Sequence, residues 1–187
     1  MQASDDVLAR ARRIKLVAMD VDGVMTDGSI VLSDNGETKI FNVRDGLAIT
    51  VARNEGLRFA IITGRTSAAV QRRAAELKID ILEMSCHGKA AALKDIAAKQ
   101  DCGFWEIAYI GDDWNDIAAM RMSGLSVAPA DAPFDIRRYA DVVTSAGGGK
   151  GAVREFLEWL LDAQGGWTNA AERYVDALNA GIEESRQ

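Results

Sequence analysis

The feature that most constrains the fold of this chain is an alternation of short apolar runs with longer amphipathic segments. The apolar runs, typical of buried strands, lie at residues 14–19, 58–62, 80–82, 106–110, 125–127 and 141–143. The intervening segments repeat apolar residues at three- and four-residue spacing, as helices do, at residues 46–55, 66–77, 89–99, 115–122 and 151–161. This alternation predicts an α/β fold, with a parallel sheet covered by helices on both faces. Ligands of such sheets bind at the carboxyl ends of the strands.

One stretch interrupts the alternation. Residues 29–33 and 37–43 are predicted as two strands around the turn Asp34-Asn35-Gly36, whose residues favour a β-hairpin. The hairpin directly follows the first core strand, where a site at the sheet end would lie. Near the other end of the chain, Gly165-Gly166 precedes a final helix over about residues 169–182. We therefore expect one domain over residues 1–164 and a C-terminal helical extension over residues 165–187.

Composition excludes several kinds of protein. A single histidine and two cysteines, Cys86 and Cys102, cannot build a multi-histidine or cysteine-rich zinc site. The formal net charge of −6, from 28 acidic and 22 basic residues, argues against a partner that is a nucleic acid. No apolar stretch approaches the length of a membrane span, and the first residues lack a signal-peptide pattern. We expect a cytoplasmic protein with no membrane partner.

Two carboxylates follow the first core strand. Asp20 and Asp22 are two residues apart, so on an extended chain both face the same site, and Gly23 then allows a sharp turn. Ordinary turn aspartates are the common alternative. A calcium loop of the EF-hand type is excluded, because Met25 stands where that loop needs glycine.

Two further segments bring polar groups to strand ends. Thr63 and Arg65 close the second core strand, although an N-cap role is the usual explanation of such a threonine. Lys89 begins a helix directly after Gly88, where its charge opposes the helix dipole. A lysine at that position therefore has another function or is solvated.

A second acid cluster follows the strand at residues 106–110. Asp112, Asp113 and Asp116 supply three carboxylates within five positions, and an N-cap role explains one of them. Gathered carboxylates repel one another unless a cation joins them. Oxygen ligands with few histidines suit Mg²⁺, which also binds substrate phosphate, and a hydroxyl and a lysine suit the remaining phosphate oxygens. The strand ends together predict Mg²⁺-dependent phosphate chemistry.

The chain resembles the haloacid dehalogenase superfamily of phosphohydrolases in four motifs. In chain order they are DVDGVMTDG, IITGR, HGK and GDDWND. The segments FNVRDG, LSVAPADA and GGGKGAVRE further resemble its 3-deoxy-D-manno-octulosonate 8-phosphate phosphatase subfamily, which also includes phosphatases of nine-carbon keto-sugar acids. The similarity covers about residues 15–164. It implies a Rossmann-like parallel sheet with a hairpin flap and no large cap domain. It also implies a small anionic sugar-phosphate substrate and a homotetramer.

The resemblance also implies roles for individual residues. Asp20 corresponds to the nucleophile that becomes an aspartyl-phosphate, and Asp22 to the general acid and base. Mg²⁺ would bind Asp20, Asp112 and the backbone carbonyl of Asp22. The further expected site residues are Asp113 and Asp116 around the metal, Thr63 and Lys89 on the phosphoryl group, and Arg44, Arg65 and Lys150 on the sugar acid. Lys150 departs from the arginine common in the family, so it keeps the charge without the bidentate fork.

Other functions use related residues. A non-enzymatic phosphorelay receiver domain also combines an acid pair, a phospho-accepting aspartate, a threonine and a lysine. Receivers lack the inserted hairpin and place the phospho-acceptor two strands after the acid pair, whereas here a second acid cluster follows the lysine. A non-catalytic scaffold is disfavoured by the intact set of motif residues. The choice between an eight-carbon and a nine-carbon substrate stays open.

Overall fold

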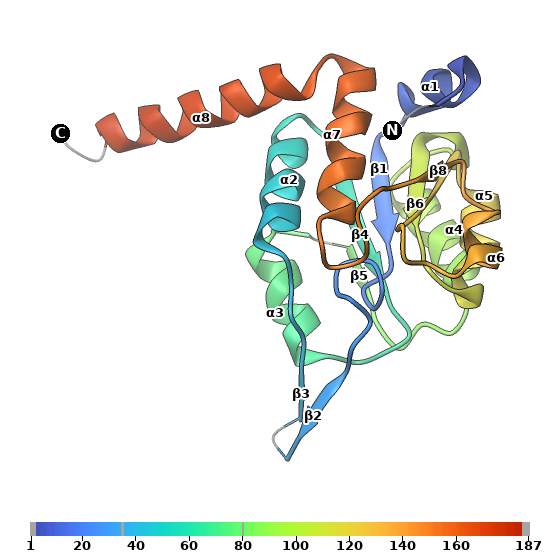
Figure 1. Cartoon of the computed structure of the whole chain (residues 1–187). Helices are drawn as coiled ribbons and strands as arrows, with labels where there is room; N and C mark the ends of the chain where they lie inside the picture. Colours follow the sequence, from blue (N-terminus) through green and yellow to red (C-terminus); the bar gives the residue numbers. More distant parts are fainter. Residues whose placement is uncertain (1–2, 35, 80, 185–187) are drawn as a thin grey trace.

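The main sheet is seen in a computed structural model that describes residues 3–34, 36–79 and 81–184. Within these residues it has six parallel strands in the order β5-β4-β1-β6-β7-β8 (Figure 1). The strands are β1 (Leu16–Met19), β4 (Arg58–Ile62), β5 (Ile81–Glu83), β6 (Ile107–Ile110), β7 (Leu125–Ala128) and β8 (Val142–Val143). The six predicted core strands are confirmed, β4 with the predicted ends and the other five with shifted ends. Asp80 of the third prediction lies outside the described residues.

Helices cover both faces of this sheet, as the alternation predicts (Figure 1). In β1, Val17 and Met19 pack into one core cluster, and Leu16 and Ala18 into the other. Burial on both faces explains why the strands are continuously apolar. The first cluster includes α2 (Val43–Asn54), α3 (Ala68–Glu76) and α7 (Ala152–Gln164), and the second α4 (Lys89–Lys99), α5 (Ile117–Met122) and α6 (Phe134–Arg137). Two short 3₁₀ helices, η1 (Phe104–Glu106) and η2 (Trp114–Asp116), flank β6.

The position of β1 in the strand order determines where a ligand can bind. From β1 the chain continues to β4 and β5 on one side, and then crosses to β6 on the other side. The strand order therefore reverses at β1, which is where open α/β sheets bind their ligands. Because β4 and β6 are its two neighbours, the carboxyl ends that precede Asp20, Thr63 and Asp112 meet at one edge.

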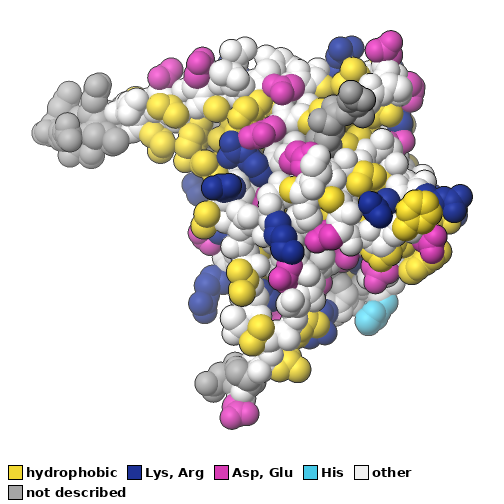
Figure 2. All heavy atoms as spheres, in the orientation of Figure 1, with side chains coloured by type: hydrophobic (Ala, Val, Ile, Leu, Met, Phe, Trp, Pro, Cys, Tyr) yellow, Lys and Arg dark blue, Asp and Glu magenta, His cyan; other side chains and the backbone are white. Residues whose placement is uncertain are grey.

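The predicted hairpin is present but shorter than expected. β2 (Val31–Ser33) pairs antiparallel with β3 (Gly36–Thr38), while Asn35 of the turn lies outside the described residues. The prediction of a strand through residue 43 is wrong, because α2 already begins there: the side chain of Asn42 accepts a hydrogen bond from the backbone nitrogen of Arg44 at 2.8 Å. Figure 2 shows hydrophobic side chains on the hairpin, at the lower end of the molecule.

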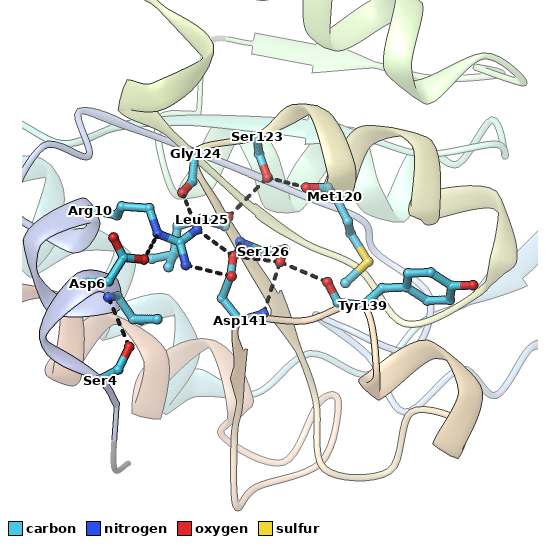
Figure 3. Close-up of polar contacts among 11 residues, drawn as sticks. Ser4, Asp6, Arg10, Met120, Ser123, Gly124, Leu125, Ser126, Tyr139 and Asp141 are labelled. Atoms are coloured by element: carbon cyan, nitrogen blue, oxygen red, sulfur yellow. Dashed lines mark hydrogen bonds and ion pairs between the residues drawn. The ribbon is translucent and has the colours of Figure 1, made fainter.

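An N-terminal helix that we did not predict, α1 (Asp5–Ala11), is pinned to the edge of the sheet (Figure 3). Arg10 donates to both carboxylate oxygens of Asp141, at 2.6 and 3.0 Å, and to the carbonyl of Gly124 at 3.0 Å. The same carboxylate accepts hydrogen bonds from the backbone nitrogen and the hydroxyl of Ser126, at 2.9 and 2.8 Å. This bidentate pair joins α1 to β7 and to the segment before β8.

The final helix, α8 (Trp167–Glu184), packs only its first half on the domain. Ala170 is buried, and Arg173 pairs with Glu55 at 2.5 Å, next to α2. Beyond this contact the helix projects away from the domain (Figure 1), and Val175 and Leu178 are half exposed. The division between residues 164 and 165 stays a prediction. Among the helices of the described residues, none is long and apolar enough to cross a membrane.

Candidate active site

Asp20 stands directly after β1 and is held by two donors. Its backbone nitrogen still bonds the carbonyl of Ile110 at 3.0 Å, so the residue extends the β1–β6 pairing. One carboxylate oxygen accepts from the backbone nitrogen of Val21, and the other contacts the Lys89 ammonium, each at 2.7 Å. The side chain is nearly buried, so its orientation is fixed before any ligand binds.

Lys89 begins α4 and places its ammonium between two carboxylates. Its Nζ lies 2.7 Å from Asp20 and 2.7 Å from Asp116, and the residue is 2% exposed. Burial alone would lower the pKa of Lys89, but the charges of Asp116 and Asp20 outweigh this and raise it. This ion pairing explains a lysine at a helix N-terminus that has neither a side-chain cap nor an acidic residue in its first turn.

Asp116 is a buried carboxylate that accepts four hydrogen bonds from its neighbours in the acid cluster. One of its oxygens accepts from Lys89 and from the hydroxyl of Tyr109, both at 2.7 Å. The other accepts from the backbone nitrogens of Asp112 and Asp113, at 3.2 and 3.3 Å. The residue is fully buried and both of its oxygens are occupied, so it orients the loop that carries Asp112.

Asp112, in contrast, has a free oxygen. Its Oδ1 is buried with no hydrogen-bond partner among the described residues. Carboxylate oxygens of Asp112, Asp20 and Asp116 lie within 4.8 Å of one another. A Cβ at Gly23 would lie 1.9 Å from Oδ2 of Asp112, so only glycine leaves room for this carboxylate. A buried unpaired oxygen beside other carboxylates is a donor set that fits a divalent cation.

The charges of this cluster shift two pKa values. Burial, assisted by Asp116 and Asp20, raises the pKa of Asp112 to about 8. Burial and the charge of Asp116 likewise raise the pKa of Asp20 to about 6, against the lowering effect of Lys89. Lys89 alone therefore does not neutralise the cluster, and without a cation the folded protein holds a proton on Asp112 at neutral pH.

A cavity of about 290 Å³ opens over the cluster. At its β4 side, Thr63 is 2% exposed and its hydroxyl accepts from the backbone nitrogen of Arg65 at 3.4 Å. Asp113 caps η2 by accepting from the backbone nitrogen of Trp114, which is the N-cap role expected of one acid in this cluster. The predicted site residues that line the cavity are Asp20, Asp22, Thr63, Arg65, Asp112 and Asp113.

Two predicted site residues lie elsewhere in this chain. Arg44 is exposed in the first turn of α2, and Lys150 is exposed in the glycine-rich segment before α7. Neither lines the cavity. Their contact with the substrate stays a prediction, and within one chain their positions do not support it.

The glycine-rich segment supports the site in another way. A Cβ at Gly148 would lie 1.9 Å from the carbonyl oxygen of Gly23, so this segment packs directly on the loop after Asp20. Asp45 of α2 fixes the following helix by accepting from the backbone nitrogen of Arg154 at 2.8 Å. The FNVRDG and GGGKGAVRE motifs therefore meet in space, and the second of them packs on the loop after Asp20.

Sequence reasoning missed three polar residues near the site. Lys39, just after the hairpin, is ion-paired with Asp22, and Glu37 lies 3.8 Å from Lys39 and 3.1 Å from Arg65. No pattern in the sequence distinguishes Lys39 from a surface lysine. Tyr109 had a signal, because its hydroxyl interrupts an otherwise apolar strand and needs a partner when buried.

Comparison with known proteins agrees with this geometry. A sequence model of the haloacid dehalogenase-like hydrolase family matches residues 87–157. The 3-deoxy-D-manno-octulosonate 8-phosphate phosphatase of Escherichia coli is 47% identical over 164 residues, which is 87% of this chain and 87% of that protein.

Solved structures extend the comparison. The crystal structure of the phosphatase of the same name from Yersinia pestis superimposes with a TM-score of 0.83 at 43% identity, covering 86% of this chain and 87% of that one. The Moraxella catarrhalis phosphatase, crystallised with magnesium, phosphate and KDO, gives a TM-score of 0.86 at 38% identity, covering 93% and 98%. The chain therefore belongs to the haloacid dehalogenase-like hydrolases, and within them to the family of 3-deoxy-D-manno-octulosonate 8-phosphate phosphatases.

Proposed function

We propose that this protein is a Mg²⁺-dependent phosphatase that hydrolyses 3-deoxy-D-manno-octulosonate 8-phosphate to the free sugar acid and inorganic phosphate. The observation that carries this proposal is the unpaired Asp112 oxygen next to Asp20, at the floor of a cavity that holds a threonine and an arginine. The relatives that share 38–47% of their residues with this chain are phosphatases of this sugar acid by name, and one binds magnesium, phosphate and KDO.

Asp20 is the proposed nucleophile. Its carboxylate attacks phosphorus, a P–O bond to Asp20 forms, and the ester P–O bond to the sugar breaks. The backbone nitrogen of Val21 and the ammonium of Lys89 hold the carboxylate in its orientation. A fixed nucleophile lowers the entropic cost of reaching the in-line geometry.

Asp22 is the proposed general acid and base. It lines the cavity and is partly exposed, so its carboxyl group can reach the leaving oxygen. In the first step it gives a proton to the sugar oxygen. In the second step it takes a proton from the water that attacks the aspartyl-phosphate, which regenerates Asp20 and releases phosphate.

The carboxylates of Asp20 and Asp112, with the backbone carbonyl of Asp22, would hold Mg²⁺. When bound, the ion neutralises charge on the transferring phosphoryl group. Asp116 keeps Asp112 in place through the two backbone hydrogen bonds described above. Asp113 lies at the rim of the cavity, where it can bind water around the ion.

Positive and hydroxyl groups complete the phosphate site. Thr63 presents a hydroxyl to the cavity at the end of β4, and the ammonium of Lys89 lies behind the cavity lining, 2.7 Å from Asp20. Both can bind phosphoryl oxygens. Arg65 lies at the mouth and is our candidate for the carboxylate of the sugar acid. A nine-carbon keto-sugar acid 9-phosphate is the alternative substrate, because it presents the same two anionic groups.

We propose that the protein assembles as a homotetramer in which neighbouring subunits cover the hairpin. Leu32 of β2 is 75% exposed, and just after the hairpin Ile40 and Val43 are 76% and 79% exposed. A two-stranded hairpin that exposes such residues is marginally stable alone and is expected to be covered. We propose the cytoplasm as the compartment, because the thiols of Cys86 and Cys102 are both free.

The first prediction concerns the nucleophile. Asp20→Asn should lower kcat by about 10³-fold or more, because the amide cannot form the phosphoenzyme. Phosphate release should be measured with an eight-carbon and a nine-carbon keto-sugar acid phosphate and an aldose phosphate, each with and without EDTA. Exposed Asp95→Asn is the matched control and should behave as wild type. Wild-type protein that releases no phosphate, or an Asp20→Asn variant that retains it, would contradict the proposal.

The second prediction concerns pH and the metal. The raised pKa values of Asp112 and Asp20 mean that the folded state keeps protons that the unfolded chain loses above about pH 4. This contribution to stability is present below about pH 4 and is lost as the pH rises through about 6 and about 8. In EDTA, the free energy of unfolding of the wild-type protein should therefore fall as the pH is raised from about 5 to about 8.5. This fall should exceed the fall measured for Asp112→Asn by about 1 kcal/mol or more.

Urea unfolding of the two proteins at both pH values measures this difference. Excess Mg²⁺ should restore wild-type stability at the higher pH and should not restore that of Asp112→Asn, which lacks a ligand. Equal pH dependence of the two proteins in EDTA would refute the description of the acid cluster.

The third prediction concerns assembly. Light scattering of the purified protein should give four times the chain mass of 20.2 kDa. Leu32→Asp places a charge on the exposed face of the hairpin and should reduce that mass. A monomeric wild-type protein would contradict the proposed tetramer.

A further inference from the structure

We propose that Lys39 is a positioning residue for catalysis: its ammonium holds the carboxylate of Asp22 at the rim of the cavity and couples that carboxylate to the hairpin. This inference rests on the proposed function, in which Asp22 is the acid and base. It adds a residue from the hairpin side of the site that none of the sequence motifs indicates.

Lys39 is a buried lysine whose ammonium lies between two carboxylates. Its Nζ is ion-paired with Oδ1 of Asp22, and its side chain is 1% exposed. The second anion nearby is Glu37 of β3, whose Oε1 lies 3.8 Å away. The ammonium therefore faces two carboxylates, one from the loop after β1 and one from the hairpin.

Glu37 connects Lys39 to Arg65, which lines the cavity. Its Oε2 accepts from Arg65 at 3.1 Å, and a hydrogen bond with Ser67 lowers the pKa of Glu37 more than any other contact does. Ser67 is buried at the N-cap of α3, so the anchor is rigid. A continuous chain of charged groups thus runs from Asp22 through Lys39 and Glu37 to Arg65.

Lys39 acts through Asp22 and not on the substrate. It does not line the cavity, whereas Asp22 and Arg65 at the two ends of the chain do. Its side chain is almost wholly buried, and its ammonium is paired with Asp22 and faces Glu37. What it can do is fix the direction of the Asp22 carboxylate, which otherwise stands on a solvent-facing loop and is 21% exposed.

A purely stabilising role explains this arrangement less well. Desolvating an ammonium is costly, and a buried ion pair is often replaceable by apolar residues without loss of stability. A lysine placed between Asp22 and the hairpin is instead suited to orienting the carboxylate of Asp22. Misplacing a proton-transfer group by about 1 Å can lower the rate by about 10²-fold.

A double-mutant cycle tests this inference. Steady-state phosphate release from 3-deoxy-D-manno-octulosonate 8-phosphate with Mg²⁺ should be measured for wild type, Lys39→Met, Asp22→Asn and the double variant. Lys39→Met should lower kcat by about 10- to 100-fold and change KM by less than about 2-fold. In the Asp22→Asn background the same substitution should change kcat by less than about 2-fold, because its target is already lost.

Two controls separate positioning from structure. Lys39→Arg keeps the charge and should retain kcat within about 5-fold of wild type, while Lys94→Met, an exposed lysine in α4, should match wild type. If Lys39→Met shows no cooperative thermal transition and so does not fold, the same double-mutant cycle is measured with Lys39→Gln, and its result tests the role of Lys39.

The outcomes are distinct. Equal losses of kcat in the wild-type and Asp22→Asn backgrounds, or an unchanged kcat in Lys39→Met, would overturn the role of Lys39. A wild-type enzyme that does not release phosphate from this substrate would instead overturn the proposed function, whatever Lys39 does.

Discussion

The buried ammonium of Lys89 is the interaction on which the rest of the site depends. It joins the start of α4 to Asp20 after β1 and to Asp116 after β6, each at 2.7 Å, so three separate elements are tied at one point. Without it, two desolvated carboxylates would face each other unpaired, which is strongly unfavourable. One ammonium cannot balance three acids, and the unpaired oxygen of Asp112 is the consequence. A cation bound to this oxygen would balance the remaining negative charge of the site.

This local arrangement explains how a chain with a net charge of −6 can bind an anionic substrate. Part of the acidic surplus is gathered around the metal site and is offset when the ion binds. Arg65 supplies positive charge at the wall of the cavity, and the buried Lys89 supplies it behind Asp20. The hairpin and the glycine-rich segment then enclose the loop after Asp20, the latter by a contact so close that Gly148 can carry no side chain.

Much of this could be predicted from the sequence, for a physical reason. Buried strands are apolar, helices repeat every three to four residues, and the residues at strand ends are placed by topology, so the sheet and Asp20, Thr63, Lys89 and Asp112 follow from local patterns. The start of α2 was misplaced because the cap at Asn42 was not recognised. The position of Lys39 and the exposed positions of Arg44 and Lys150 could not be predicted, because they depend on how the hairpin, the start of α2 and the glycine-rich segment pack around the site.

At neutral pH a proton occupies the carboxyl group of Asp112 until Mg²⁺ replaces it. Titration calorimetry of Mg²⁺ binding at about pH 7, repeated in two buffers that differ in ionisation enthalpy, counts the protons released per ion. Because the pKa of Asp112 is raised to about 8 in the metal-free protein, about one proton should be released per Mg²⁺ bound. Binding without proton release, or no binding of Mg²⁺, would contradict it.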